Sequence, residues 1–558
     1  MSTRRDPEAS LHRDLEDRSH GRTVCSDPME RRRFLKVAAA AAAASGVHPG
    51  ALTAAERRRP VAVQEAQDAL VPLGNGEPPA LQFQAYPGGT GVLLERLWGE
   101  AGGIPSERQK IDIGPWPGPA PTDPADIAFL PAHRLGALIR DRKITSAELT
   151  DIYLERMRKY DPLLLCAVTI LEDRARAEAK EADSELRAGR WRGPLHGVPW
   201  GVKDLFSVTG ARTTWGSADF ENRMIDEDAE LVVRLRAAGA VLIAKLATGE
   251  FARGANWYRG QTRNAWNPEQ SSSGSSAGPG SATAAGLVGF SIGTETRGSI
   301  VGPSRRGGLS ALRPTFGRIS RHGGMVLAWS MDKPGPMCRS SEDCAIVFNA
   351  IHGSDPKDPA TLTAPFRFER QPDLSRMSIG YTEDAPQAFV AKLRELGADP
   401  KPMAELPESG SSGLGVESSA AFDFHVAPGG VLESVPEPAD GEDARPPRFH
   451  GGRSALALDF IQGQRRRHIL MQEMAKAMEG FDMFVTGSGE TGLTNETGHP
   501  AAVLPYAFGD SNTEDEYDHE QPICTTIIGD LFADDKILSV AHAYQSATDW
   551  HQRHPDLG

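Results

Sequence analysis

The sequence has few cysteines, no long apolar run and no excess of positive charge. Its five cysteines among 558 residues show no Cys-x-x-Cys spacing, so we expect scattered buried thiols, although Cys338 and Cys344 could pair. The formal net charge of −14 speaks against nucleic acid as the main partner, because phosphate binding requires concentrated Lys and Arg. No metal-binding or nucleotide-binding motif occurs, so neither a metal ion nor another cofactor is expected. The composition is otherwise ordinary for a globular protein, with 39% apolar and 24% charged residues.

The N-terminal region is typical of an export signal followed by an irregular arm. A paired arginine in ERRRFLK (residues 30–36) precedes a weakly apolar alanine run, which is the pattern of a twin-arginine leader. The run is shorter than the roughly 18–20 apolar residues that a spanning helix requires. We therefore predict a leader over residues 1–58 and a periplasmic or secreted protein without stable membrane insertion. The alternative is an alanine-rich helix after a basic surface segment, in a cytoplasmic protein.

Residues 59–124 are rich in Pro and Gly and predict an irregular arm with one helix near 92–100. Residues 125–555 form the predicted main domain. Thr145 and Glu148 fit a capping box at a helix start. Periodicity predicts further helices over 172–186, 231–235, 461–478 and 536–552, and strands over 241–245, 481–487 and 501–508. Alternating helices and short apolar strands indicate an α/β sheet, while residues 404–450 are expected to be irregular.

One Gly- and Ser-rich stretch, residues 270–303, carries most of the functional information. It reads QSSSGSSAGPGSATAAGLVGFSIGTETRGSIVGP, with serine-bearing turns around Ser275 and Ser299 on either side of an apolar segment. Small residues let backbone N–H groups gather around one point, which suits an oxyanion beside a serine nucleophile. A flexible Gly/Ser linker would not need the apolar segment, so the stretch is interpreted as part of a core. Residues 274–278 also match G-x-S-x-G, but no strand precedes them as a nucleophile elbow requires.

A serine nucleophile needs a base within hydrogen-bond reach. None of the 15 histidines lies in a recognisable triad context. The best candidate is Lys203, in the apolar segment HGVPWGVKDLF, because burial can lower a lysine pKa by up to about 3–5 units. The alternative is a lysine at a strand end, with its amine in solvent and paired with Asp204.

Taken together, GVKD, NP-x₆-SSAG, GTETRGSIVGP and LRPTFGRIS resemble the amidase signature family in order and spacing. The resemblance runs from about residue 127 to 552 and includes TSAEL, AKLATGEFARG and TGHPAAVLP. It implies the α/β amidase signature fold, a large twisted mixed β-sheet core covered by helices on both faces.

The resemblance also implies a cofactor-free Ser–Ser–Lys hydrolase that acts on linear amides through an acyl-enzyme. Neutral Lys203 would take a proton from Ser275, which a cis peptide holds, and Ser275 would take one from the nucleophile Ser299. The implied oxyanion hole consists of the backbone N–H groups of Thr296, Arg297, Gly298 and Ser299.

Four positions depart from the family pattern without removing a member of the triad. Arg297 replaces a usual glycine and could crowd the oxyanion hole, be strained at positive φ, or aim a cation at the pocket. Glu295 stands for a common aspartate, and Val301 for an arginine that often contacts it. Pro279 replaces the last serine of its motif.

The expected activity is cleavage of a carbon–nitrogen amide bond, or an ester, in a small molecule. The alternatives are an amidotransferase A-type subunit that releases ammonia from glutamine, and a non-catalytic binding protein on the same scaffold. Specificity is expected from loops near 251–258 and within 404–450. Arg253, Trp257 and Tyr258 are the substrate-binding candidates and would favour an aromatic or acidic acyl group, although packing explains the two aromatic residues equally well. The sequence predicts no oligomeric state.

Overall fold

The computed structural model describes residues 90–103, 108–410, 413–426, 451–510 and 520–558. The predicted leader over 1–58 lies outside these residues, as does the arm up to residue 89. In the described part of the arm, the expected helix is present as α3 (Thr90–Ala101), whose Leu93 packs with Leu531 and Phe532. None of the described helices combines the length and the apolar character needed to cross a membrane.

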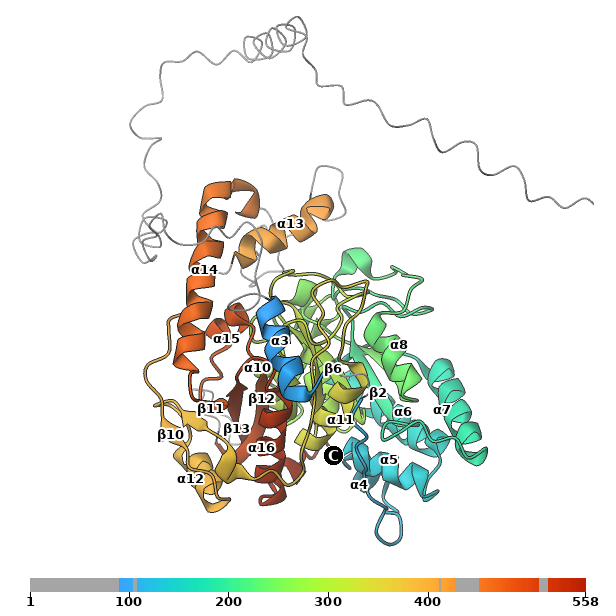
Figure 1. The fold of residues 1–558 in the computed structure, drawn as a ribbon. Coiled ribbons are helices and arrows are strands. Elements are labelled where there is room, and N and C mark those ends of the chain that lie inside the picture. The colour runs from blue at the N-terminus through green and yellow to red at the C-terminus, as the bar shows by residue number, and fades with distance from the viewer. Residues whose placement is uncertain (1–89, 104–107, 411–412, 427–450, 511–519) are drawn as a thin grey trace, which may run out of the picture. The chain divides into compact units, whose positions relative to one another are not determined.

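An eleven-stranded mixed sheet forms the centre of the described chain (Figure 1). Its strand order is β1-β3-β2-β6-β8-β7-β12-β13-β11-β9-β10. The strands are β1 (Ala167–Ile170), β2 (Pro199–Lys203), β3 (Val241–Leu246), β6 (Phe290–Glu295), β7 (Ser310–Arg313), β8 (Lys333–Cys338), β9 (Ile379–Tyr381), β10 (Lys401–Pro402), β11 (Met483–Thr486), β12 (Ala501–Asp510) and β13 (Glu520–Gly529). A separate two-stranded hairpin consists of β4 (Asn256–Trp257) and β5 (Gly260–Gln261).

Helices flank this sheet, which confirms the predicted fold class. Figure 1 shows α6, α7 and α8 on the side of the sheet where β2 lies and α12 beside β10. The helices are α4 (Pro124–Ala128), α5 (Ala132–Arg140), α6 (Ser146–Leu164), α7 (Glu172–Arg187), α8 (Glu230–Ala237), α9 (Ala277–Ala284), α10 (Val301–Gly307), α11 (Ser341–Ile351), α12 (Gln387–Glu395), α13 (Leu414–Val426), α14 (Ala457–Ala477), α15 (Thr491–Thr497) and α16 (Asp534–Ser546). Short 3₁₀ turns are η1 (Ala218–Phe220), η2 (Glu250–Ala252), η3 (Leu374–Arg376), η4 (Gly451–Ser454) and η5 (Trp550–Gln552).

The start of α6 shows how local sequence sets an element. The Thr145 hydroxyl accepts a hydrogen bond from the Glu148 N–H at 3.1 Å, and the Glu148 carboxylate accepts one from the Thr145 N–H at 2.8 Å. This reciprocal pair is the predicted capping box, which satisfies two N–H groups that the helix leaves unbonded. Leu149, Tyr153 and Met157 then recur at helical spacing and are fully buried.

Two helices begin directly after the two serine-bearing turns. α9 follows Ser275 and Ser276 and contacts β2, β3, β6 and β8, while α10 follows Ser299 and contacts β7, β12 and β13. The helices also contact each other. The Gly- and Ser-rich stretch is therefore core structure, as predicted, and small residues allow its close packing: a Cβ on Gly278 would lie 2.3 Å from the Ala247 nitrogen. The four described cysteines are buried and free, so Cys338 and Cys344 do not pair.

Three boundaries differ from the sequence-based expectation. Residues 404–450 were expected to be irregular, yet α13 lies within them. Several of its residues, among them Gly, Val, Ser and Phe, are weak helix formers. Tertiary contacts hold the helix, since Phe422 is buried and Glu417 is bonded to Ser330. The closing helix ends at Ser546 rather than at 552, where the Ser546 and Thr548 hydroxyls bond the carbonyls of the last turn. The sequence analysis assigned no strand to 520–529, which form β13.

Candidate active site

Lys203 ends β2 in the interior of the sheet, between β3 and β6. Its side chain is fully buried, and its Nζ lies 2.8 Å from Ser275 Oγ, 3.1 Å from Ser276 Oγ and 2.8 Å from Thr294 Oγ1. Ser276 donates its own proton to the Thr294 carbonyl at 3.0 Å, so it can only accept from the amine. A neutral amine has two N–H bonds and one lone pair. The geometry thus allows Ser275 to donate to that lone pair.

The surroundings of Lys203 favour its neutral form. Among the described residues, no carboxylate lies within 4.0 Å of its amine. Burial lowers the pKa of Lys203 well below the ordinary value of 10.5, and the charges of Asp332 and Glu295 offset only part of this effect. Asp204, the partner of the alternative interpretation, pairs instead with buried Lys245 at 2.7 Å. The interpretation of Lys203 as a solvated, Asp204-paired lysine is therefore wrong.

The turn that carries Ser275 is held by close backbone contacts. The peptide bond between Gly274 and Ser275 is cis. A Cβ on Gly274 would lie 1.9 Å from the Gly254 carbonyl oxygen, so only glycine fits there. The next residue, Ser276, donates its N–H to the Ser299 carbonyl at 3.2 Å. That bond ties the two serine-bearing turns together. No strand precedes this turn, so the G-x-S-x-G match is not a nucleophile elbow.

Ser299 is half-buried and lies on the turn between β6 and α10. Gly298 precedes it with φ +94°, a left-handed conformation that favours glycine. Arg297 does not adopt positive φ, so the predicted strain is absent, and its side chain is exposed. Within the described chain, no group accepts a hydrogen bond from the backbone N–H of Thr296, Arg297, Gly298 or Ser299. The turn thus presents unoccupied donors beside a hydroxyl.

Glu295 anchors the end of this turn from inside the core. Its Oε2 accepts the N–H groups of Ile300 at 2.8 Å and Val301 at 2.9 Å. Its Oε1 accepts from Arg313 at 3.0 Å and from Asn495 at 2.7 Å. Burial would raise the pKa of Glu295, but the Arg313 charge and these hydrogen bonds outweigh it and lower that pKa. Arg313 on β7 therefore makes the contact with residue 295 that an arginine at position 301 often makes in the family. Arg313 belongs to the motif LRPTFGRIS, but the motif does not indicate which residue it contacts.

A second buried carboxyl, Asp332, holds the other end of the turn and was not found from the sequence. Thr296 donates its hydroxyl proton to Asp332 Oδ1 at 2.6 Å. The N–H groups of Leu327 and Ala328 donate to Oδ2 at 2.7 and 3.0 Å. Burial raises the pKa of Asp332, against the effect of these bonds. The residue lies in a loop without a motif, so only the folded chain reveals its position.

Two of the three substrate-binding candidates pack against neighbouring side chains, and the third is exposed. Trp257 lies on β4, is 4% exposed and packs with Val168 and Ala247. The ring of Tyr258 meets the Trp257 ring edge-on at 5.1 Å. Arg253 is exposed. Packing accounts for the two aromatic residues, and a substrate contact of these three residues stays a prediction.

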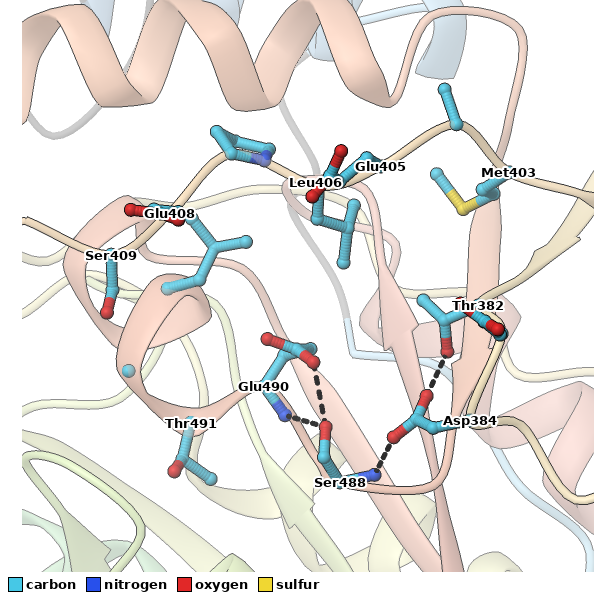
Figure 2. Close-up of a pocket in the computed structure, with 15 residues that line it drawn as sticks. Thr382, Asp384, Met403, Glu405, Leu406, Glu408, Ser409, Ser488, Glu490 and Thr491 are labelled. Atoms are coloured by element: carbon cyan, nitrogen blue, oxygen red, sulfur yellow. Dashed lines mark hydrogen bonds between the residues drawn. The ribbon is translucent and has the colours of Figure 1, made fainter.

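A cavity of about 990 Å³ adjoins the Ser299 turn (Figure 2). Thr491 connects the two, because its Oγ1 lies 3.6 Å from the position of a Cβ on Gly298 and Thr491 lines the cavity. Figure 2 shows Ser488 between two carboxylates, with its N–H 2.6 Å from Asp384 Oδ2 and its hydroxyl 2.7 Å from Glu490 Oε1. The lining residues are Thr382, Glu383, Asp384, Met403, Ala404, Glu405, Leu406, Pro407, Glu408, Ser409, Ser488, Glu490, Thr491, Gly492 and Leu493.

The chain was compared with protein families, with curated proteins and with solved structures. Residues 148–403 match the Amidase family. The A-type subunit of glutamyl-tRNA(Gln) amidotransferase from Roseiflexus sp. (strain RS-1) is 33% identical over 483 residues, which cover 75% of this chain and 96% of that protein. The native peptide amidase from Stenotrophomonas maltophilia matches with a TM-score of 0.65 and 28% identity over 75% of this chain and 96% of that one.

An amidase family protein from Bacillus anthracis str. Ames has the same fold, with a TM-score of 0.66 and 23% identity over 78% of this chain and 94% of that one. The sequence and structural matches thus extend over nearly the whole length of each of these proteins. The motifs GVKD, NP-x₆-SSAG, GTETRGSIVGP and LRPTFGRIS lie within the residues that match the Amidase family. The chain belongs to the amidase signature family.

Proposed function

We propose that this protein hydrolyses the carbon–nitrogen bond of small amides, and esters as well, with Ser299 as the nucleophile. The observation that carries the proposal is the buried Lys203 amine, which has no carboxylate partner among the described residues and lies 2.8 Å from Ser275 Oγ. An amine in this state is a base, whereas a paired ammonium is not. The family membership supports the same chemistry.

In the proposed acylation step, Ser275 transfers its proton to the lone pair of Lys203 and receives the proton of Ser299. The Ser299 oxygen forms a bond to the substrate carbonyl carbon, and the carbonyl π electrons move to the oxygen. The unoccupied N–H groups of residues 296–299 then stabilise this oxyanion, at about 3–4 kcal/mol per donor. When the tetrahedral intermediate collapses, the carbon–nitrogen bond breaks and the relay returns the proton to the leaving amine.

The acyl-enzyme would be cleared by the same relay. Lys203 and Ser275 take a proton from a water molecule, whose oxygen attacks the ester carbonyl and displaces Ser299. The proton then returns to the Ser299 oxygen. No redox partner or external base is consumed, so the site residues account for every proton in the cycle.

The test is hydrolysis of a panel of aryl amides and esters by the purified protein and by Ser299→Ala. We expect turnover and covalent fluorophosphonate labelling at Ser299 in the native protein, and neither in the variant. A folded native protein that is neither active on the panel nor labelled would contradict the proposal. Such a result would favour a non-catalytic role for the scaffold.

The second candidate function is that of an amidotransferase A-type subunit, which the names of curated relatives such as the Roseiflexus protein favour. Such a subunit would use the same three residues to release ammonia from glutamine. The two functions differ in their dependence on a partner. Hydrolysis of simple amides by the isolated chain supports the first candidate, whereas ammonia release from glutamine that requires a co-purifying protein supports the second.

We also propose that residues 1–58 direct export through a twin-arginine route. The paired arginines and the alanine run in the sequence support this proposal. Replacing Arg31, Arg32 and Arg33 with lysine keeps the charge and removes the arginine pair. We expect the native chain outside the cytoplasm and the variant inside it, as measured by cell fractionation. An unchanged location would contradict export by this route.

A further inference from the structure

Arg297, two residues before Ser299, is a cation without an ionic partner in the part of the chain that the structure describes. Its side chain is exposed, and within the described chain no carboxylate forms an ion pair with it. Other exposed arginines differ in this respect: Arg158 pairs with Glu172 and Arg553 with Glu520, whereas Arg142 and Arg253 form no ion pair within the described chain. An unpaired guanidinium beside a candidate nucleophile is placed to contact whatever approaches that nucleophile.

The guanidinium lies against bare backbone at one end of the acidic cavity. A Cβ on Gly492 would lie 3.2 Å from Arg297 Nη2 and 3.0 Å from Ser409 Oγ. Gly492 therefore leaves room for both polar groups. Ser409, Thr491 and Gly492 all line the cavity, and Figure 2 shows Ser409 and Thr491 at the same end of it. This end, which we call the arginine end, adjoins the Ser299 turn through Thr491.

The rest of the cavity has the opposite charge. Its lining includes five carboxyl side chains, namely Glu383, Asp384, Glu405, Glu408 and Glu490. A sixth carboxyl, Glu496, is buried next to the arginine end, where its Oε2 accepts the Gly410 N–H at 2.9 Å. Burial raises the pKa of Glu496, while the charges of Arg297 and Arg467 act in the opposite direction.

We propose that Arg297 selects amide substrates that carry one carboxylate, and that it holds this carboxylate at the arginine end while the amide carbonyl lies at Ser299. The inference rests on the proposed hydrolase function and names its substrate class. A guanidinium binds a carboxylate through two parallel charge-assisted hydrogen bonds, which fix orientation as well as charge. The acidic lining repels a second carboxylate, so monocarboxylates are favoured over dicarboxylates.

The test compares two substrates of equal length, the mono-p-nitroanilide of succinic acid and the p-nitroanilide of butyric acid. We expect the native protein to prefer the succinic compound in kcat/KM. Arg297→Gln should lower the ratio of kcat/KM for the succinic compound to kcat/KM for the butyric compound about 10- to 150-fold, the range for loss of a charged hydrogen-bonding group. An effect of the substitution on the oxyanion hole would change both substrates alike and cancels in this ratio. Arg297→Lys keeps the charge but cannot form the two parallel hydrogen bonds of a guanidinium. Its preference for the succinic compound should lie between those of the native protein and Arg297→Gln.

Gly492→Ala tests the position of the guanidinium without removing it. The added methyl group would lie 3.0 Å from Ser409 Oγ, 3.2 Å from Arg297 Nη2 and 3.3 Å from Ser409 Cβ, so the guanidinium and Ser409 must both shift by a few tenths of an ångström. We expect a smaller loss of succinic preference than in Arg297→Gln. Arg142→Gln, at an exposed arginine that bonds only the Leu186 carbonyl, is the matched control and should leave the preference unchanged.

A readout that needs no turnover is protection of Ser299 from a fluorophosphonate. Succinamate should protect the native protein more than butyramide does, and this difference should vanish in Arg297→Gln. The inference is overturned if Arg297→Gln lowers kcat/KM equally for both substrates, or if the native protein shows no preference for the substrate with a carboxylate. Absence of labelling at Ser299 overturns the hydrolase proposal itself, so the two failures are distinguishable.

Discussion

Lys203 and Lys245 lie on neighbouring parallel strands and are both fully buried, yet their surroundings differ. Lys245 pairs with Asp204 at 2.7 Å and donates to Thr213 Oγ1 at 2.9 Å. Lys203 meets only hydroxyl and carbonyl oxygens. Burial lowers the pKa of both amines, but the Asp204 charge offsets the effect for Lys245, and the pKa of Lys203 falls much further. One residue type is thus paired with a carboxylate at one position and, in our proposal, serves as a neutral base at the other.

The comparison shows that a carboxylate within contact distance distinguishes the two roles. Asp204 follows Lys203 directly in the chain, but the strand end turns its carboxylate towards Lys245. Its Oδ2 accepts the N–H of Thr214 at 2.9 Å, which fixes that orientation. The alternative that paired Lys203 with its sequence neighbour Asp204 was therefore wrong, because the side chains of neighbouring residues in a strand point to opposite sides of the sheet.

The largest effect is expected from Lys203→Met, which removes the base and keeps a similar side-chain volume. We expect kcat/KM to fall about 10²- to 10⁴-fold, the contribution of a positioned general base. Thermal unfolding should show no loss of stability, because no buried charge loses a partner. Loss of folding together with activity would mean that Lys203 is a structural cation like Lys245.

Lys245→Met should give the opposite result. Removing one partner leaves Asp204 buried and unpaired, which costs about 3–5 kcal/mol in the free energy of unfolding, measured by urea denaturation. Folded protein should keep most of its activity. The double variant Asp204→Asn with Lys245→Met should recover part of the stability. A double variant as unstable as Lys245→Met alone would contradict the role of Lys245 as the charge partner of Asp204.

The two lysines should also differ in how stability depends on pH. The pKa of Lys203 is lowered in the folded protein, so the unfolded chain binds one more proton between that pKa and 10.5. Native stability should therefore fall as pH decreases through this window, by up to about 1.4 kcal/mol per pH unit. Lys203→Met removes this contribution, so its free energy of unfolding should depend less steeply on pH. Identical slopes in the two proteins would contradict a depressed pKa at Lys203.

The smallest predicted effect comes from Glu295→Gln. The negative charge of Glu295 raises the pKa of Lys203, so its removal should lower that pKa further. Because the neutral amine is the active form, the acidic limb of the kcat/KM profile should move to lower pH. A shift to higher pH would show that Glu295 acts on the rate through the turn geometry alone.

Local signals in the sequence predicted several helices and three strands of the sheet, whereas the mixed-sheet fold and the roles of the three candidate catalytic residues were predicted from the family resemblance. The capping box at Thr145, the apolar strand 241–245 and the two serine-bearing turns need only neighbouring residues. The supports of the site are not local: Arg313 reaches Glu295 from β7, and Asp332 reaches Thr296 from a loop. Their roles depend on strand order, which no pattern in the chain specifies. The same holds for α13, whose helix depends on contacts made by Phe422 and Glu417.

The most direct test of the neutral lysine is the pH dependence of fluorophosphonate labelling at Ser299. The rate reports nucleophile activation without requiring a known substrate. The account predicts that the rate rises with pH, with a midpoint well below the ordinary lysine value of 10.5, and that Lys203→Met is slow and lacks this rise. Equal rates and profiles in the native protein and Lys203→Met would contradict the account.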